Sequence, residues 1–273
     1  MSARPRSPSG LVFAALALLA AVAWIGPYVW MLATSLRPLA EIVARPDALV
    51  PEHPTLGAYR ELFATLPVAR TMALTIGLAV VIALLQIAIA LPAGYALAKL
   101  DFRGRRAAFA LVLACLLVPA QVTFVPLYLF FAELHLVNTI TALVLPFAVS
   151  ALGTFLVRQA MQSIPDEIVE AARLDGASEW TIVYRILAPL MAPTLASLFL
   201  VSFVFHYSDY FWPLVMTTDD SVRTLPLGVA LLREQGSGVR WHVLMAGNVV
   251  LSAPILALFA LVQQKLVQGL SGR

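Results

Sequence analysis

The sequence predicts an all-α membrane protein with six transmembrane helices. The chain of 273 residues is 61% hydrophobic and only 12% charged, whereas about a quarter of the residues in an average soluble domain are charged. The charges are also unevenly spaced, because six long stretches contain no Asp, Glu, Lys or Arg. Each stretch exceeds the roughly 20 residues that a helix needs to cross the hydrocarbon core of a bilayer. The stretches are Leu11–Leu36, Thr71–Ala98, Ala107–Ala132, Leu134–Val157, Ile186–Ser208 and Trp241–Gln264.

These stretches predict helices rather than the strands of a β-barrel. A transmembrane strand has about 10 residues of alternating polarity, and none of the six stretches alternates in this way. A helix also satisfies its backbone hydrogen bonds within itself, which the hydrocarbon core requires.

The first stretch begins like a signal peptide, because Arg4 and Arg6 precede it. It is longer than the apolar part of a typical signal peptide, and no cleavage pattern of small residues follows it. Trp24, Tyr28 and Trp30 lie near its far end, where aromatic side chains suit the interface between membrane and water. We therefore expect a retained helix, with a cleaved signal as the alternative.

The distribution of Lys and Arg predicts the orientation of the helices. If the N-terminus is cytoplasmic, the cytoplasmic segments hold 11 Lys and Arg residues and the opposite segments hold 7. The positive-inside rule then places both termini in the cytoplasm, and the basic turn Lys99–Arg106 carries most of the difference. The predicted organisation is a cytoplasmic N-terminus at 1–10, a transmembrane domain at 11–270 and a cytoplasmic tail at 271–273.

The connections between the helices predict local structure on both sides of the membrane. The outside segment Arg37–Arg70 is rich in proline. Within it, Thr55–Phe63 predicts a short surface helix with Thr55 as its N-cap. On the cytoplasmic side, Asp101 and Gly104 predict a tight turn between the second and third helices.

The cytoplasmic segment Arg158–Arg185, between the fourth and fifth helices, predicts a helix–turn–helix. Ser163 is a suitable N-cap, and Pro165 is tolerated in a first helical turn. Asp166 and Glu167 then suit the positive end of the helix dipole. An apolar stripe follows, formed by Ile168, Ala171, Ala172 and Leu174.

The second half of this segment predicts a turn and another helix. Gly176 is placed to end the first helix in a left-handed conformation, and Ser178 can cap a second helix at Glu179–Arg185. The whole segment carries five acidic residues and three Arg, unlike a basic loop that binds lipid headgroups. An acidic, capped and partly apolar helix pair is better explained by a protein partner.

The same segment resembles the signature loop of binding-protein-dependent ABC permeases. The chain reads EAARLDGAS and then RILAPLMAP, and the family pattern is Glu-Ala-Ala, a Gly several residues on, and an Ile-x-Leu-Pro element. Ala188 stands where the family commonly has Leu, which weakens one packing contact. The matching residues are Glu170, Ala171, Ala172, Asp175, Gly176, Ala177, Ile186, Pro189 and Pro193.

Other segments resemble the carbohydrate branch of this family, which includes the maltose-type and glycerol-3-phosphate-type importers. Together they extend the resemblance over residues 70–270. The segments are Leu91–Arg106, Val125–Thr139, Thr154–Ser178, Tyr210–Leu214 and Gln263–Leu270.

The resemblance implies one subunit of an ATP-driven importer in the inner membrane. Two permease subunits, usually different, form the pathway, and each binds one of two copies of an ABC ATPase subunit. An extracytoplasmic binding protein delivers the solute, which for this branch is a sugar or a sugar-like molecule. This chain has no GxxxxGK[ST] phosphate-binding loop, so we expect no cofactor of its own, and ATP bound by the partner subunit.

The resemblance also implies seven coupling residues. Glu170 would contact polar or basic groups in a groove of the ATPase, Gly176 would permit the sharp turn between the two helices, and the alanines would allow close approach. The alternative is an ordinary surface helix held to its own protein. The implied coupling residues are Glu170, Ala171, Ala172, Asp175, Gly176, Ala177 and Pro189.

Polar side chains within the apolar stretches are candidates for the solute pathway, since such groups usually face a partner or a cavity. Aromatic residues near the outer end of the fifth stretch are added because sugar sites use aromatic faces. The alternatives are hydrogen bonds between helices and anchoring at the membrane interface. The candidates are Gln121, Asn138, Thr154, Ser202, His206, Tyr207, Tyr210 and Asn248.

The sequence shows no constellation of catalytic or metal-binding residues, so we expect a non-catalytic subunit. The four His residues lack metal-ligand spacing, and a single Cys cannot form a disulfide within the chain. The net charge of +3 gives no argument for a nucleic-acid partner. A permease for a non-carbohydrate solute is the main alternative. An ion-coupled secondary transporter is a weaker one, because the six stretches contain no carboxylate.

Overall fold

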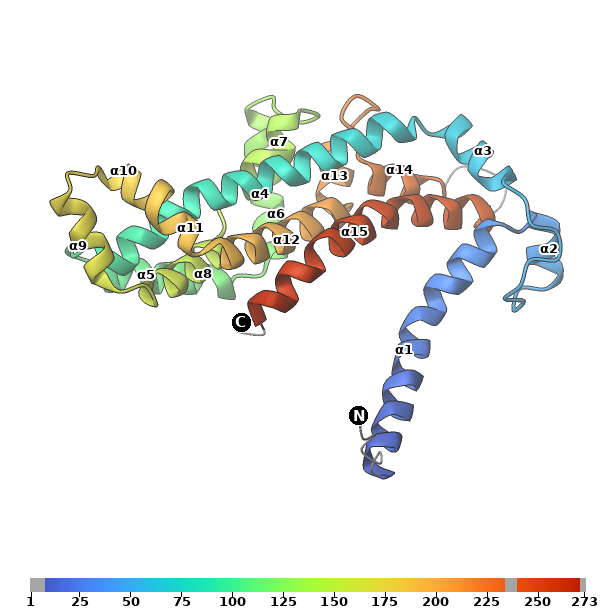
Figure 1. Cartoon of the computed structure of the whole chain (residues 1–273). Coiled ribbons are helices and arrows are strands. Elements are labelled where there is room, and N and C mark those ends of the chain that lie inside the picture. Colours follow the sequence, from blue (N-terminus) through green and yellow to red (C-terminus); the bar gives the residue numbers. More distant parts are fainter. Residues whose placement is uncertain (1–7, 234–239, 271–273) are drawn as a thin grey trace. The chain divides into compact units, whose positions relative to one another are not determined.

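The computed structural model describes residues 8–233 and 240–270, and helices form every regular element within them (Figure 1). The predicted tail at 271–273 and most of the predicted N-terminal segment 1–10 lie outside the described residues. The elements are α1 (Pro8–Ser35), α2 (Leu39–Ala44), α3 (Gly57–Thr65), α4 (Val68–Lys99), α5 (Arg105–Leu117), α6 (Ala120–Glu133), α7 (Ile140–Val144), η1 (Leu145–Phe147), α8 (Ala151–Gln162), α9 (Asp166–Leu174), α10 (Glu179–Thr181), η2 (Ile182–Leu187), α11 (Ala188–Leu190), α12 (Ala192–Ser208), α13 (Phe211–Met216), α14 (Leu225–Leu231) and α15 (Trp241–Leu270).

The described helices include three that are long and apolar enough to cross a bilayer by themselves, at Leu16–Ser35, Val68–Lys99 and Trp241–Ala260. Three further pairs of consecutive elements reach that length only across a bend. The bend is 98° between α5 and α6, 42° between the α7–η1 segment and α8, and 85° between the α10–α11 segment and α12. The third, fourth and fifth apolar stretches are therefore not single straight helices.

Prolines and left-handed residues explain where these stretches break. A proline lacks the backbone N–H and clashes with the preceding helical turn. Pro119 directly precedes α6, and Pro189 follows η2, a six-residue π-helix that widens the turn before it. In the fourth stretch, His135 and Asn138 have positive φ angles of 55° and 63°, so the helix begins only at Ile140.

The chain divides into two compact units. The first unit contains Met1–Val68 and Gly228–Pro254, and a fully buried Arg37 organises its first loop. The guanidinium donates to Glu41 Oε1 at 2.8 Å and to the carbonyl of Ala48 at 2.9 Å. A buried charge is tolerated when it is paired and hydrogen-bonded, so these contacts give the proline-rich segment a defined structure.

Helix α3 confirms the short helix predicted at Thr55–Phe63, but its start differs by two residues. Leu56 is the N-cap, and Thr55 Oγ1 instead accepts the backbone N–H of Gly57 at 3.1 Å. Ala58 and Leu62 are buried, so one face of α3 belongs to the core of the first unit.

The second unit contains Ala69–Leu227 and Ile255–Arg273, and all of α4 except its first residue, Val68, belongs to it. Helix α8 crosses α4 at Gly94, where an added Cβ would lie 2.6 Å from Val157 Cγ1. Between α4 and α5, Gly104 has a φ of 90° and confirms the predicted turn.

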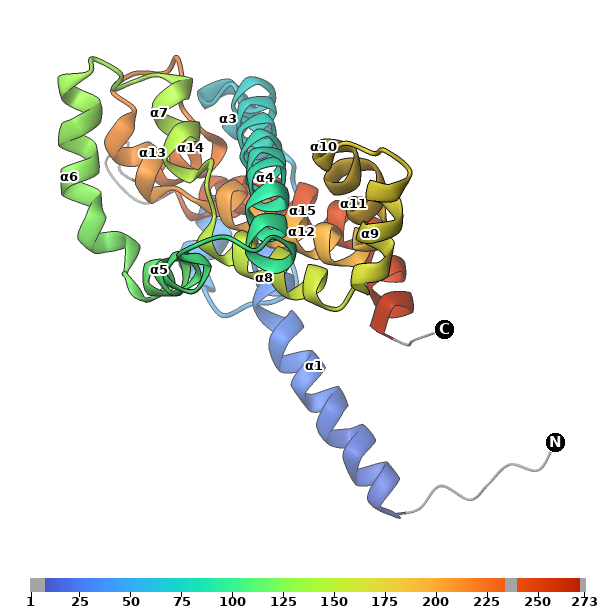
Figure 2. The same cartoon turned by 90° about the vertical axis from the view of Figure 1, so that its left-hand side faces the viewer.

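An aromatic cluster around Trp212 joins α6, α7 and α13 in the second unit. Figure 2 shows the backbones of these three helices on one side of the molecule. The Trp212 ring lies 5.3 Å from the Phe124 ring, centroid to centroid, in an edge-on arrangement. The indole N–H donates to the carbonyl of Ala142 at 2.8 Å. The segment α9–α11 lies at the Lys99 end of α4, and the helices α7 and α13 of the cluster lie farther along α4 (Figure 1).

Candidate functional site

We call residues 165–181, which comprise α9, the following turn and α10, the α9–α10 hairpin. Helix α9 begins at Asp166 with Pro165 at the N-cap position and no side-chain cap. The N-cap predicted at Ser163 is wrong, because α8 continues to Gln162 and Ser163 is its C-cap. The Ser163 hydroxyl donates to the carbonyl of Ala160 at 2.7 Å, so it is engaged with the preceding helix.

The turn of the hairpin has the predicted left-handed glycine. Gly176 has a φ of 78°, and its N–H donates to the carbonyl of Arg173 at 3.0 Å. The N–H of Ala177 donates to the carbonyl of Ala172 at 3.0 Å. This pair of bonds is a Schellman motif, which satisfies the last carbonyls of α9. Ser178 then caps α10 as predicted, its Oγ accepting the N–H of Thr181 at 3.3 Å.

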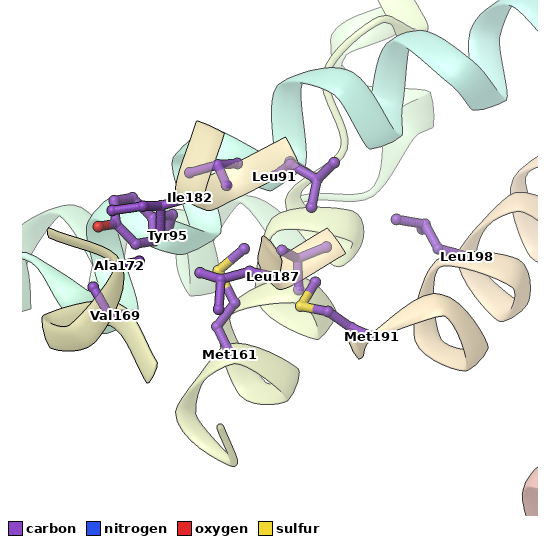
Figure 3. Packing of buried hydrophobic residues seen from close by; sticks show 12 residues of the cluster. Leu91, Tyr95, Met161, Val169, Ala172, Ile182, Leu187, Met191 and Leu198 are labelled. Carbon is purple, nitrogen blue, oxygen red and sulfur yellow. The ribbon is translucent and has the colours of Figure 1, made fainter. Parts of the chain in front are cut away.

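The inner face of the hairpin differs from the predicted apolar stripe. Val169 and Ala172 are the buried residues of α9, with exposed fractions of 3% and 8%. Figure 3 shows both side chains in the cluster that contains Tyr95 of α4 and Ile182 of η2. Burying one Val side chain stabilises the folded state by about 1.5–3 kcal/mol. The hairpin is therefore packed onto the membrane helices rather than loosely attached to them.

The outer face of the hairpin is exposed and mixes acidic, small and apolar side chains. Leu174 is 89% exposed and Trp180 is 65% exposed, while Glu170 and Ala171 are also exposed. Large apolar side chains exposed to water commonly mark a surface that binds another protein. Of the other residues implied to couple, Asp175, Gly176 and Pro189 are exposed, Ala177 is half-buried and Ala172 is buried.

Polar contacts at the start and at the turn of the hairpin connect it to α4, and the sequence alone did not reveal them. At the start, Lys99 Nζ donates to Asp166 Oδ1 at 2.5 Å. At the turn, Arg173 Nη2 donates to the hydroxyl of Tyr95 at 3.0 Å, and Arg173 Nε donates to Glu179 Oε1 at 2.9 Å. The sequence shows that these residues carry groups able to pair. It does not show which of them pair, because the partners lie 67 and 78 positions apart.

The eight candidates for the solute pathway differ in burial and in the elements that carry them. Thr154 and Ser202 are buried, with Thr154 Oγ1 donating to the carbonyl of Ser150 at 3.0 Å. Gln121 and Tyr210 are exposed. The other four are His206 and Tyr207 on α12, Asn138 in the α6–α7 loop and Asn248 on α15.

His206 lines a small cavity in the second unit. Its Nε2 lies 3.2 Å from Nε2 of Gln86, which also donates to the carbonyl of Phe147 at 2.8 Å. The cavity of about 20 Å³ also touches Asp209 and Thr224. That volume holds about one water molecule, so in this conformation the cavity is too small for a sugar ring.

Asn138 connects two loops at the other end of the second unit from the hairpin. Its Nδ2 donates to Asp219 Oδ2 at 2.8 Å, its Oδ1 accepts the N–H of Thr218 at 3.1 Å, and its own N–H donates to the carbonyl of Met216 at 2.8 Å. The hydrogen bonds from Ser221 and Asn138 hold the pKa of Asp219 below its usual value. The carboxylate is therefore charged at neutral pH, and its contribution to stability is lost only as the pH falls through the lowered pKa.

We expect Asn138→Ala to loosen the connection between these loops. Ala removes the side-chain bonds and is less tolerant than Asn of the positive φ at this position, so we expect a loss of about 1–3 kcal/mol in the free energy of unfolding. Faster hydrogen exchange at the Thr218 amide measures the loss directly. Thr123→Ala, a polar-to-Ala change outside these loops, serves as the control. Unchanged exchange at Thr218 in Asn138→Ala would contradict the connection.

Within residues 8–233 and 240–270, no group of three or more His, Cys, Asp or Glu residues is arranged to hold a metal ion. The fold and the hairpin together define a helical, multi-pass membrane protein with one projecting helical hairpin. The chain belongs to the binding-protein-dependent transport system inner membrane components, a family that matches residues 87–272. It is therefore a permease subunit of an ABC importer, in the inner membrane.

Two curated relatives and one solved structure illustrate the similarity. The chain is 36% identical to the arabinooligosaccharides transport system permease protein AraQ of Halalkalibacterium halodurans, over 72% of this chain and 70% of the relative. It is 30% identical to the sulfoquinovosyl glycerol transport system permease protein SmoH of Agrobacterium fabrum, over 90% and 86%. A chain of a bacterial ABC transporter involved in alginate import matches with a TM-score of 0.82, 24% identity and 97% and 98% coverage, which shows a shared fold.

Proposed function

We propose that this chain forms half of the pathway of an ATP-driven importer for a sugar or a sugar-like solute. A separate ATPase subunit, present in two copies, supplies the hydrolysis of ATP, and a second permease subunit completes the pathway. An extracytoplasmic binding protein delivers the solute. The names of the relatives AraQ and SmoH support a carbohydrate or a sugar glycoside.

The proposed topology has six spans and both termini in the cytoplasm. Three single helices and three bent pairs are consistent with six crossings. This arrangement puts the α9–α10 hairpin on the same side as both termini, where the ATPase would be. A permease for a non-carbohydrate solute is the second candidate.

The outer face of the hairpin is the observation that carries the proposed coupling function. Its inner residues are used for packing against α4 and η2, so Glu170, Ala171 and Leu174 are left free to contact another protein. Exposed Leu174 supplies apolar area, Ala171 allows close approach, and Glu170 supplies a charge that a basic group can pair with. These three side chains would lie in the groove of the ATPase subunit.

We expect Glu170→Lys to abolish ATPase association and uptake while the protein remains in the membrane. The substitution reverses the charge of an exposed side chain, so folding is little affected, whereas a reversed charge at an interface can cost several kcal/mol of binding free energy. Affinity purification in mild detergent, followed by identification of co-purifying proteins, measures the association. Glu133→Lys makes the same change at another exposed position and should retain the ATPase.

The same purification tests the proposed function as a whole. The wild-type chain should recover an ATPase subunit and a second permease, and the reconstituted complex should import arabino-oligosaccharides or sulfoquinovosyl glycerol in the presence of the binding protein. Import of amino acids or peptides alone would favour the second candidate. Transport by a stable preparation of this single chain would contradict the two-permease pathway.

A further inference from the structure

We propose that Tyr95, Arg173 and Glu179 form a latch that holds the α9–α10 hairpin to α4, so that a pull on the hairpin moves α4. This inference rests on the proposed function, because it concerns how movement of the ATPase reaches the membrane helices. The latch is a positioning device and makes no contact with ATP or solute.

The latch is a closed triangle of hydrogen bonds between three elements. Arg173 of α9 donates from Nε to Glu179 Oε1 at 2.9 Å and from Nη2 to Glu179 Oε2 at 3.3 Å. Arg173 Nη2 also donates to the hydroxyl of Tyr95 at 3.0 Å. The Tyr95 hydroxyl in turn donates to Glu179 Oε2. Each of the three side chains therefore contacts the other two.

The position of the triangle restricts the turn that carries the outer face. Arg173 and Glu179 lie on either side of Gly176, so their ion pair closes the turn, and Tyr95 connects the closed turn to α4. The two charged side chains are 41% and 52% exposed, and exposed ion pairs stabilise a fold little. The function of the ion pair is therefore to fix geometry rather than to stabilise the fold. Arg173 makes a two-point contact with the Glu179 carboxylate, and the same carboxylate accepts a hydrogen bond from the buried Tyr95 phenol.

Lys99 provides a second attachment on the same face of α4. Tyr95 and Lys99 are four residues apart and so project from one side of the helix. The Lys99 side chain is only 5% exposed, and Nζ donates to the carbonyl of Ile164 and to Asp166 Oδ1, each at 2.5 Å. The beginning and the turn of the hairpin are thus both fixed to the last turns of α4.

Apolar packing between the two attachments also holds the hairpin against α4. Val169 and Ala172 lie against Tyr95 in the buried cluster (Figure 3), so the hairpin cannot rotate on α4 without losing apolar contacts. A loose hairpin could follow the ATPase while α4 stayed in place. With the latch closed, displacement of the outer face requires displacement of α4.

Tyr95→Phe in the assembled importer tests this inference, because it removes the hydroxyl and leaves the ring in the buried cluster. We expect the ATPase subunit to co-purify and ATP hydrolysis to continue, while the solute transported per ATP hydrolysed falls about three-fold or more. Tyr184→Phe is the matched control, since it removes a hydroxyl that donates to the carbonyl of Ala88 on α4, outside the hairpin. That variant should keep the wild-type ratio.

A charge exchange gives an independent readout. Arg173→Glu and Glu179→Arg should each lower the transport per ATP, and the double variant should restore it in part, because the exchanged pair can again bind the phenol. Wild-type ratios in Tyr95→Phe, or no recovery in the double variant, would overturn the latch. Loss of the ATPase from wild-type preparations would instead contradict the proposed function, so the two failures are distinguishable.

Discussion

Gly176→Pro is expected to abolish uptake while the protein remains in the membrane. Gly176 has a φ of 78°, whereas proline requires a φ near −65°. Proline also removes the N–H that donates to the carbonyl of Arg173. It further restricts the preceding residue to extended backbone, whereas Asp175 has a φ of −77° and a ψ of 3°. The turn would therefore reorient, and α9 and α10 would no longer present one outer face to the ATPase.

The expected loss of uptake in Gly176→Pro does not depend on a steric clash at Cβ. A Cβ built at Gly176 has no neighbouring atom within 4 Å, so the expected defect comes from the backbone conformation and the lost N–H rather than from a steric clash at Cβ. Gly176→Asn is the matched control, because Asn tolerates the left-handed conformation and keeps its N–H. We expect Asn to retain most of the uptake and the ATPase. Normal ATPase association by Gly176→Pro would refute the docking role of the hairpin.

Gly94→Leu is expected to have the second large effect, by forcing apart the crossing of α4 and α8. A Cβ at Gly94 would lie 2.6 Å from Val157 Cγ1 and 3.0 Å from the backbone nitrogen of Arg158. Backbone cannot move aside as the end of a side chain can, and overpacking costs about 1–3 kcal/mol or more. Val157 belongs to the cluster beneath the hairpin, so both the midpoint of thermal unfolding and the uptake should fall.

Gly77→Leu provides the comparison on the same helix. No atom lies within 4 Å of a Cβ at Gly77, and Leu has a better helix propensity than Gly by about 0.8 kcal/mol. We expect this variant to unfold at or above the wild-type temperature. Equal unfolding temperatures for Gly77→Leu and Gly94→Leu would show that the close crossing is not a constraint.

Features that depend on neighbouring residues in the chain were predictable. The caps of the hairpin are an example, because the left-handed Gly176 and the Ser178 cap are set by side chains within a few positions. The N-cap predicted at Ser163 was wrong for a reason that is also local. Helix α8 extends to Gln162, and its last turn engages Ser163 before α9 begins, so two local signals competed for one residue.

The breaks in the long apolar stretches were only partly predictable. The prolines at 119, 189 and 193 were visible in the sequence, yet a proline can bend a helix slightly or end it. The 85° bend before α12 and the π-helix at Ile182–Leu187 depend on what packs around the freed carbonyls. The amino-acid composition of these stretches does not show which residues pack around those carbonyls.

The sequence by itself determined the class of the protein and the chemistry of its projecting loop. Hydrocarbon excludes unpaired backbone groups and charges, so 12% charge and six charge-free stretches allow little else than membrane helices. The tertiary structure decided which face of the loop is free. Ile168 and Val169 are adjacent and both apolar, but only Val169 is buried in the cluster that contains Tyr95, a residue of α4 more than 70 positions earlier. Such a contact depends on how distant helices pack in space, and the spacing of residues along one helix does not record it.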